Sequence, residues 1–415
     1  MNITDATMAT ANLCGAADLC AAAPCATAPC ADPWAWFETR YDDGVVVRIA
    51  RTQADADAAR SLIRDAWAVD DDEPYFYGLF DDARQLFANV VEPSTRCGDL
   101  QKLDAICLMV DARDEKGRSR TVGTFSLVLD HHAKAIEVGR GAIARAWQRR
   151  GIPAKVMGPM LRLLSTLPDY AVITDASTIA RGARAIADAL GMATVALHPS
   201  NFTVQSRAVD YWRKRLTERR GPEIARALLR RSCKTGLGRF TTSYHCRLPR
   251  TLAPAQPVLT AAQQPFYAHT CRVSRLDGRS AQWQQPQLRE TVVRERRHTA
   301  TRTIVDPPLA FDVCTQVFDA ADEGFETLVV QVPCDVTHRA LAERLETLGA
   351  ILGGVFVDTH GCWRASYTLL TSVGHDARVR RDLAALAAHD ALDGDAGALL
   401  RLVVEQACSG LDNAC

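Results

Sequence analysis

Residues 137–152 read Glu-Val-Gly-Arg-Gly-Ala-Ile-Ala-Arg-Ala-Trp-Gln-Arg-Arg-Gly-Ile. The first seven residues predict a strand, the next form a turn rich in arginine, and Gly151-Ile152 opens a helix. A helix that starts from such a turn offers free backbone N–H groups, the positive end of its dipole and guanidinium groups to one anion. The stretch therefore indicates a pyrophosphate site and a nucleotide-derived cofactor.

The surrounding elements predict an α/β fold with a mixed, mostly antiparallel central sheet flanked by helices. Strands at 105–110, 122–129 and 136–143 follow one another in hairpin order. The helix after the turn carries apolar residues at i, i+4 spacing from Ile152 to Leu164, which indicates a buried face. The remaining expected elements are a strand at 45–49, helices at 53–67 and 82–91, a strand at 170–174, a helix at 179–190 and a strand at 194–198.

This order and motif resemble the GCN5-related N-acetyltransferase (GNAT) superfamily. Its pattern is Glu-x-Gly-Arg-φ-Ala-Val, a link that ends in an aromatic residue, and Arg/Gln-x-x-Gly-x-Gly/Ala at a helix start. The chain follows this pattern without insertion through Trp147 and Gln148 to Gly151. The resemblance covers residues 44–200 and implies a GNAT fold, N-acetyltransferase activity and acetyl-CoA or another acyl-CoA as co-substrate.

The resemblance also implies site residues. Glu137 is the candidate general base, and its simpler interpretation is a strand-edge carboxylate paired with Arg140 or Arg120. Main-chain groups at Ala142 and Ile143 would bind the pantetheine arm. The pyrophosphate cradle would consist of Gln148, Arg149, Arg150, Gly151, Ile152 and Ala154. No metal is expected.

Three positions depart from the family pattern. Pro153 stands where the family has glycine or alanine, and it has no N–H to donate. Ala187 replaces the family's frequent tyrosine acid and Ala180 its asparagine, with Tyr170 and Tyr211 as weak substitutes. We therefore expect weakened cofactor binding, and a non-catalytic acyl-CoA-binding or regulatory protein stays an alternative.

A second, smaller unit repeats part of the first. At a constant offset of 158, Val172 matches Val330, and the Leu-Gly pair at 190–191 matches the pair at 348–349. This unit resembles half of a GNAT domain. We expect strands at 328–332, 352–357 and 363–370, and helices at 336–348, 379–391 and 396–407.

Five segments follow from these patterns. They are a flexible tail rich in cysteine and alanine at 1–43, a GNAT acyltransferase domain at 44–200, a basic helical segment and irregular connector at 201–310, the GNAT-like half domain at 311–375 and C-terminal helices at 376–415.

Residues 201–250 are strongly basic, with thirteen lysines and arginines against three acidic residues. The segment could bind the 3′-phosphate of coenzyme A, an acyl carrier protein acting as alternative donor, or nucleic acid. It could equally be a solvated helix face that balances acidic helices. Because no nucleic-acid reading motif occurs, nucleic acid is not an expected partner.

Composition narrows the class further. The formal net charge is zero, and no apolar run is long enough to predict a membrane span. The fourteen cysteines are scattered without a Cys-x-x-Cys pair, so we expect reduced thiols in a cytoplasmic protein. Motifs of zinc hydrolases, serine hydrolases and P-loop enzymes are absent from the sequence.

The expected acceptor is an amine on a small molecule or a protein. The aromatic run at 75–77 lies beside the acidic run at 70–73, which would suit a cationic acceptor, and His131-His132 lies in a loop near the expected entrance. Core packing and solvent exposure are their simpler interpretations.

Overall fold

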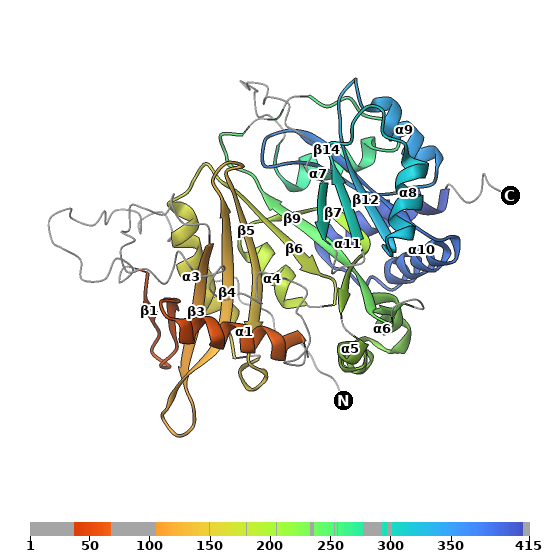
Figure 1. Ribbon diagram of the computed structural model, residues 1–415. Coiled ribbons are helices and arrows are strands. Elements are labelled where there is room, and N and C mark those ends of the chain that lie inside the picture. Colours follow the sequence, from red (N-terminus) through yellow and green to blue (C-terminus); the bar gives the residue numbers. More distant parts are fainter. Residues whose placement is uncertain are drawn as a thin grey trace.

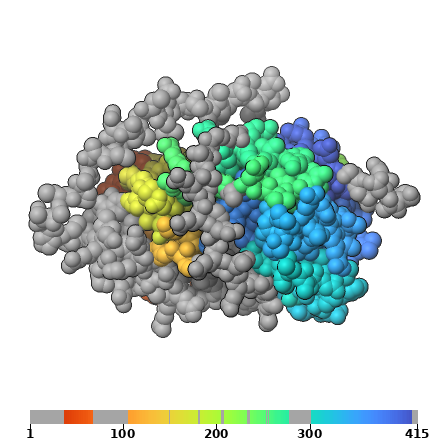
Figure 2. All heavy atoms as spheres, turned by 90° about the horizontal axis from the view of Figure 1, so that it is seen from above, coloured from red at the N-terminus to blue at the C-terminus, as the bar shows by residue number. Residues whose placement is uncertain are grey.

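The computed structural model describes residues 37–67, 105–148, 150–179, 181–204, 206–232, 236–252, 254, 256–276, 293–296 and 301–409. The tail up to residue 36, the expected helix at 82–91 and the aromatic run at 75–77 lie outside this part of the chain. Seen from above, the earlier residues (red to yellow) and the later ones (cyan to blue) form two adjacent regions, and most of the visible green residues lie against the blue ones (Figure 2).

Two sheets organise the described residues (Figure 1). The larger sheet has the order β1-β2-β3-β4-β5-β6-β9-β7, with β8 paired to β9, and most of its neighbours are antiparallel, so the fold class expected from the sequence is confirmed. Its strands are β1 (Thr39–Arg40), β2 (Val46–Ile49), β3 (Ala105–Arg113), β4 (Ser119–Asp130), β5 (Ala135–Ile143), β6 (Ala171–Ser177), β7 (Ala193–Val204), β8 (Arg230–Arg231) and β9 (Gly238–Arg247).

The smaller sheet has the order β10-β11-β12-β14-β13. Its strands are β10 (Val293–Arg296), β11 (Thr301–Val305), β12 (Thr327–Pro333), β13 (Ile351–Val357) and β14 (Trp363–Leu370). The helices of both units are α1 (Gln53–Trp67), α3 (Ile152–Ser165), α4 (Arg181–Ala189), α5 (Ser206–Arg220), α6 (Pro222–Leu228), α7 (Gln264–Val273), α8 (Val313–Asp322), α9 (Arg339–Thr347), α10 (Val373–Ala388) and α11 (Gly394–Ser409), with a 3₁₀ turn η5 (Arg145–Trp147). None of the described helices is both long and apolar enough for a membrane crossing.

Helices cover both faces of the larger sheet. Ile106 of β3 and Ile136 of β5 line a small apolar space together with Leu163 and Leu164 of α3. Helix α1 lies across β4 and β5 on the other face (Figure 1). Side chains alternate between the two faces of a sheet along a strand. Consecutive residues of β3 are buried, so this strand is covered on both faces and forms the centre of the core.

Local polar contacts fix the start of α1. Asp55 Oδ2 accepts the backbone N–H groups of Arg51 (2.8 Å) and Thr52 (3.1 Å), and Thr52 Oγ1 accepts the Asp55 N–H in return. Arg48 bridges Asp55 (2.7 Å) and Asp111 of β3 (2.6 Å). Burial would raise the pKa of Asp55, but these hydrogen bonds outweigh it and bring the pKa to about 2.

The repeat expected from the sequence is confirmed by the strand order. In the larger sheet β5 is parallel to β6, followed by β9 and β7, and in the smaller sheet β11 is parallel to β12, followed by β14 and β13. Both ends of α4 and α9 are related by the offset of 158. Gly191 (φ 68°) and Gly349 (φ 77°) end these two helices in the same left-handed conformation.

The two sheets meet where the edge strands β7 and β13 cross. A Cβ on Gly354 would lie 2.7 Å from Ala196 Cα and would overlap the Val195 carbonyl. Ala196 and Gly354 are equivalent in the repeat, so the contact has the pattern of an isologous, pseudo-two-fold interface. Only glycine lets the two backbones approach this closely.

Helices α7 and α11 hold this crossing. Thr270 of α7 donates its hydroxyl to Val355 O (2.5 Å), and His269 Nε2 contacts Thr194 O at 3.1 Å, so one helix bonds both strands. Gln406 of α11 accepts the N–H of Leu352 at 3.0 Å. The backbone groups that the crossing removes from water are thereby hydrogen-bonded.

The segment 201–310 differs from its sequence-based prediction. It contains β9, which the basic helical pattern concealed, and β9 inserts between β6 and β7 in the larger sheet. It also contains α7, where only irregular structure was expected. The charged and aromatic residues of these stretches show no clear hydrophobic period. Their conformation is decided by contacts with residues distant in sequence, which a local pattern does not reveal.

A side chain from the N-terminal turn repairs a break inside α3. Pro159 lies within this helix and has no N–H for the carbonyl of Lys155, four residues earlier. The Tyr41 hydroxyl donates to that carbonyl instead. Lys155 Nζ in turn pairs with Asp43 Oδ2 at 2.5 Å, so the helix is fixed to the β1–β2 turn.

We expect Tyr41→Phe to lower the free energy of unfolding by about 1 kcal/mol, because it leaves a partly buried carbonyl without a donor. In a Pro159→Ala background the helix supplies its own N–H to the Lys155 carbonyl. Tyr41→Phe should then lower the free energy of unfolding by less than about 0.5 kcal/mol. Urea denaturation of the four variants measures this cycle. Equal costs in both backgrounds would contradict the assigned role of Tyr41.

We expect Gly354→Ala to lower the free energy of unfolding by at least about 2 kcal/mol, since the added methyl group overlaps β7. Gly182→Ala is the matched control, because no atom lies within 4 Å of its added Cβ and alanine favours the helix. Denaturation midpoints decide the comparison, and equal effects of the two substitutions would rule out the close crossing.

Candidate functional site

The parallel strands β5 and β6 pair only at their beginning. The paired residues run from Ala135 with Ala171 to Glu137 with Ile173. Beyond Ile173, β6 is paired with β9 alone, and beyond Glu137, β5 is paired with β4 alone. The facing edges of residues 138–143 and 174–177 therefore have no strand partner among the described residues.

A β-bulge lies in β5 just after this point. Ser126 pairs with Gly139 and Thr124 with Ala142, so Arg140 and Gly141 both oppose Phe125. Arg140 has a φ of 53°, and a Cβ on Gly141 would lie 2.9 Å from the Phe125 ring. Such a bulge bends its strand, and here it coincides with the separation of β5 from β6.

Glu137 lies at the last paired position of β5. Its neighbour Ile136 faces α3, so by strand alternation the Glu137 side chain points to the face that carries α1. The side chain is 42% exposed, and its Oε1 lies 3.6 Å from Arg140 Nη2. Arg120 pairs with Asp114 instead. The simpler interpretation of Glu137, a pair with Arg140, is thus present in the structure.

Helix α3 starts beside the open edge. Gly151 precedes it with a φ of 72°, and Lys155 is the first residue whose N–H reaches back, to Gly151 O at 3.3 Å. Earlier N–H groups have no helical acceptor. Pro153 has no N–H, so the free N–H groups of the first turn are those of Ile152 and Ala154. The Ile152 side chain is buried, and Ala154 is exposed.

Ile143 and Ala142 differ in orientation. The Ala144 N–H donates to Val122 O of β4 at 2.8 Å, so the carbonyl of the same peptide unit, on Ile143, points away from β4. Gln148 Nε2 donates to this carbonyl at 3.3 Å. Ala142 pairs with β4 and is buried. Of the two residues, Ile143 presents its main chain to the open edge.

Three arginines surround the turn before α3. Arg145 lies 4.5 Å from the Tyr211 ring centre, Arg150 lies 4.6 Å from the Trp147 ring, and Arg215 Nη2 donates to Gln148 Oε1 at 3.1 Å. None of the three has a carboxylate partner among the described residues. Arg149 lies outside those residues. The described residues of the turn therefore carry positive charge that no described carboxylate balances.

The equivalent place in the second unit lacks these features. Strands β11 and β12 stay paired over all five residues of β11, from Thr301 to Val305. The turn before α8 carries Asp306, which pairs with Arg364, and Asp312, which caps the helix by accepting the Cys314 N–H. Acidic groups and a closed strand pair leave no room or charge for an anion there.

The other residues predicted for chemistry lie elsewhere. The Tyr170 hydroxyl is 2.9 Å from His131 Nδ1, where β5 and β6 are still paired. Ala187 belongs to α4 and is fully buried in the core. Tyr211 lies beside the turn before α3, where Arg145 lies over its ring and Arg215 donates to its hydroxyl at 2.5 Å. Ala180 is outside the described residues.

Most arginines of the basic segment have structural partners. Arg230 pairs with Asp382, Arg231 with Asp210, and Arg247 donates to Leu190 O. Arg239 is buried and donates to Ser200 and Thr327, and burial brings its pKa to about 10. The strong local charge of residues 201–250 is therefore used largely to join elements of this chain.

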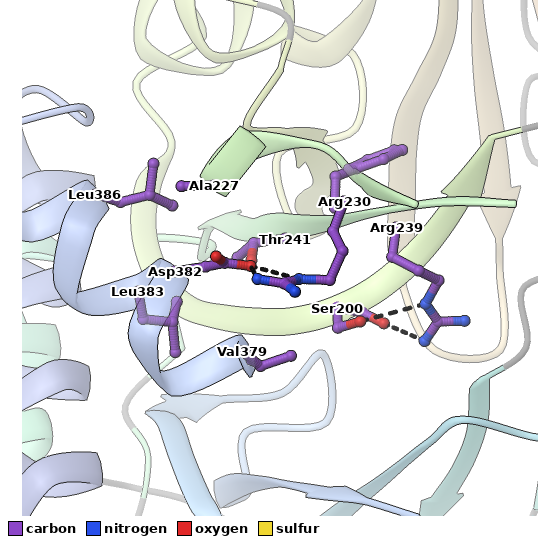
Figure 3. Close-up of a pocket in the computed structure, with 10 residues that line it drawn as sticks. Ser200, Ala227, Arg230, Arg239, Thr241, Val379, Asp382, Leu383 and Leu386 are labelled. Carbon is purple, nitrogen blue, oxygen red and sulfur yellow. Dashed lines mark hydrogen bonds and ion pairs between the residues drawn. The ribbon is translucent and has the colours of Figure 1, made fainter. Parts of the chain in front are cut away.

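A small hollow of about 20 Å³ lies between β7, β9 and α10, with room for one water molecule (Figure 3). Arg230 faces Asp382 across it, and Arg239 turns toward Ser200. Ser200 Oγ also lies 3.2 Å from His375 Nε2. Because its charged groups bond one another, this hollow is a polar junction between the two units.

The chain is similar to solved structures of acetyltransferases. Ribosomal-protein-S5-alanine acetyltransferase from Vibrio fischeri is 10% identical over 51% of this chain and 97% of its own, with a TM-score of 0.33. Spermidine N-acetyltransferase from Vibrio cholerae, in complex with CoA and spermine, is 12% identical over 49% and 95%, with a TM-score of 0.31. An IAA acetyltransferase from Bacillus cereus is 11% identical over 49% and 98%, with a TM-score of 0.29.

All three TM-scores lie below 0.5. The likeness is one of fold and carries nothing about the acceptor of this chain. No protein-family model matches the sequence, and no curated protein matches it.

The sequence pattern gave Arg145 no role and included Arg215 only as one of many cations in the basic segment 201–250. Arg145 lies inside the quoted motif, but the family pattern gives its position no role. Arg215 is far away in sequence, and its only signal was the aromatic and basic cluster around Tyr211 and Trp212.

Proposed function

We propose that this chain is an acyl-CoA-dependent N-acyltransferase that transfers an acetyl group by direct attack of an amine. The observation that supports this proposal best is the separation of β5 from β6 beside the basic start of α3. It combines an open strand edge with an anion site, which are the two features that an acyl-CoA needs.

The chain's own residues fit such a ligand. The N–H groups of Ile152 and Ala154, together with Arg150, would hold the pyrophosphate. The open edge of β5 at Ile143 would bond the extended pantetheine arm as an added strand would.

The reaction joins an amine nitrogen to the acyl carbon and breaks the carbon–sulfur bond. Glu137 would accept the proton that the amine loses, because its carboxylate is partly exposed on the α1 face at the point where the strands separate. A main-chain N–H on the open edge of β5 would polarise the acyl carbonyl. The thiolate of coenzyme A leaves and takes a proton from water.

A non-catalytic acyl-CoA-binding protein is the second candidate, and two residues favour it. Ala187 has no hydroxyl and is fully buried, so it offers no acid to the departing thiolate. Pro153 removes one N–H from the cradle. An acyltransferase that takes its acyl group from a carrier protein is a variant of the first candidate.

Calorimetric titration with acetyl-CoA, longer acyl-CoAs and an acyl carrier protein, followed by thiol release with a panel of amines, tests these candidates. We expect acetyl-CoA to bind and to be consumed, and Glu137→Gln to lower kcat by about 100-fold or more with unchanged acetyl-CoA affinity. Binding without turnover of any amine would favour the second candidate. No binding by any acyl donor would refute both.

Pro153→Ala restores an N–H at the start of α3, and we expect it to tighten coenzyme A binding about three- to tenfold. Pro159→Ala, in the same helix but buried away from its start, is the matched control and should leave the affinity unchanged. Calorimetry of both variants measures the difference. An unchanged affinity in Pro153→Ala would show that the helix start does not contact the ligand.

A further inference from the structure

Helix α5 belongs to a segment that only one unit contains. Residues 205–237 connect β7 to β9 in the first unit, whereas only residues 358–362 connect the equivalent strands β13 and β14 in the second. The longer connection reaches the turn before α3, where Arg215 bonds Gln148. The long connection is therefore present in the unit whose parallel strands β5 and β6 separate, and it lies next to that separation.

Packing holds α5 in a defined orientation. Ala208, Val209 and Leu216 are buried on one side of the helix. Trp212 contacts Trp67 at the end of α1, with ring centres 5.8 Å apart. These contacts repeat at helical spacing, so the neighbouring Arg215 is directed toward the turn by a rigid element.

Arg215 and Arg145 gather around one aromatic ring. Their guanidinium carbons lie 5.5 Å and 4.5 Å from the centre of Tyr211. Neither has a carboxylate partner among the described residues. Arg145 donates to Asp65 O at 3.3 Å and Arg215 to the Tyr211 hydroxyl at 2.5 Å, so neutral groups hold both guanidinium groups in place and leave their charge for an anion. Arginine clusters of this kind are typical of phosphate sites.

We propose that Arg215 and Arg145 form a second phosphate subsite, and that it binds the 3′-phosphate of coenzyme A. This inference rests on the proposed function. The pyrophosphate is accounted for by the start of α3, and the 3′-phosphate is the remaining charged group of the ligand. Gln148 connects the two subsites, because it bonds both Ile143 O on the open edge and Arg215.

Calorimetry with coenzyme A and with 3′-dephospho-coenzyme A tests the subsite directly. We expect the wild-type chain to bind coenzyme A about tenfold more tightly, the value of one charge-assisted hydrogen bond. Arg215→Gln and Arg145→Gln should each remove most of this preference while keeping the affinity for the dephospho ligand. Lys214→Gln removes the same charge from the exposed side of α5 and should keep the wild-type preference.

The outcomes separate this inference from the proposed function. If Arg215→Gln weakens both ligands equally, the guanidinium serves the diphosphate or the packing of α5, and the 3′-phosphate subsite is wrong. If the wild-type chain binds both ligands equally, the subsite is also wrong while the proposed function stands. If it binds neither, both are refuted. Retained dephospho-ligand binding in each variant shows that the variant is folded.

Discussion

The separation of β5 from β6 after three paired residues is the constraint on which the rest of the candidate site depends. Two parallel strands would normally satisfy each other's backbone groups along their length. Here the bulge at Arg140 and Gly141 turns β5 away, while β6 pairs with β9. An open edge results, and the start of α3 and the arginines of the turn lie beside it.

The second unit shows what the same topology gives without that separation. Its parallel strands remain paired, its helix start is capped by Asp312, and no helix corresponding to α5 is inserted between β13 and β14. Its contribution is structural, since β13 crosses β7 so closely that Gly354 faces its own equivalent, Ala196. The repeat therefore gives one candidate site and one supporting unit in a single chain.

Local patterns predicted much of this fold because they involve neighbours in sequence. The range of α1 and the helix ends beside Gly191 and Gly349 follow from period and glycine position. Long-range contacts decided what was missed. Strand β9 is defined by its partners on either side, and Arg215 reaches the turn from a helix whose Trp212 packs on Trp67. In the candidate site, the motif predicted the cradle, whereas the folded chain turned Ile143 outward and Ala142 inward.

Amide hydrogen exchange of the full chain with and without coenzyme A tests the central claim most directly. We predict slower exchange in peptides covering residues 138–155 and in α5, and unchanged exchange in residues 301–315 of the second unit. Protection centred on the second unit, or none over residues 138–155, would contradict it, because the open edge of β5 and the start of α3 would then not be the ligand site.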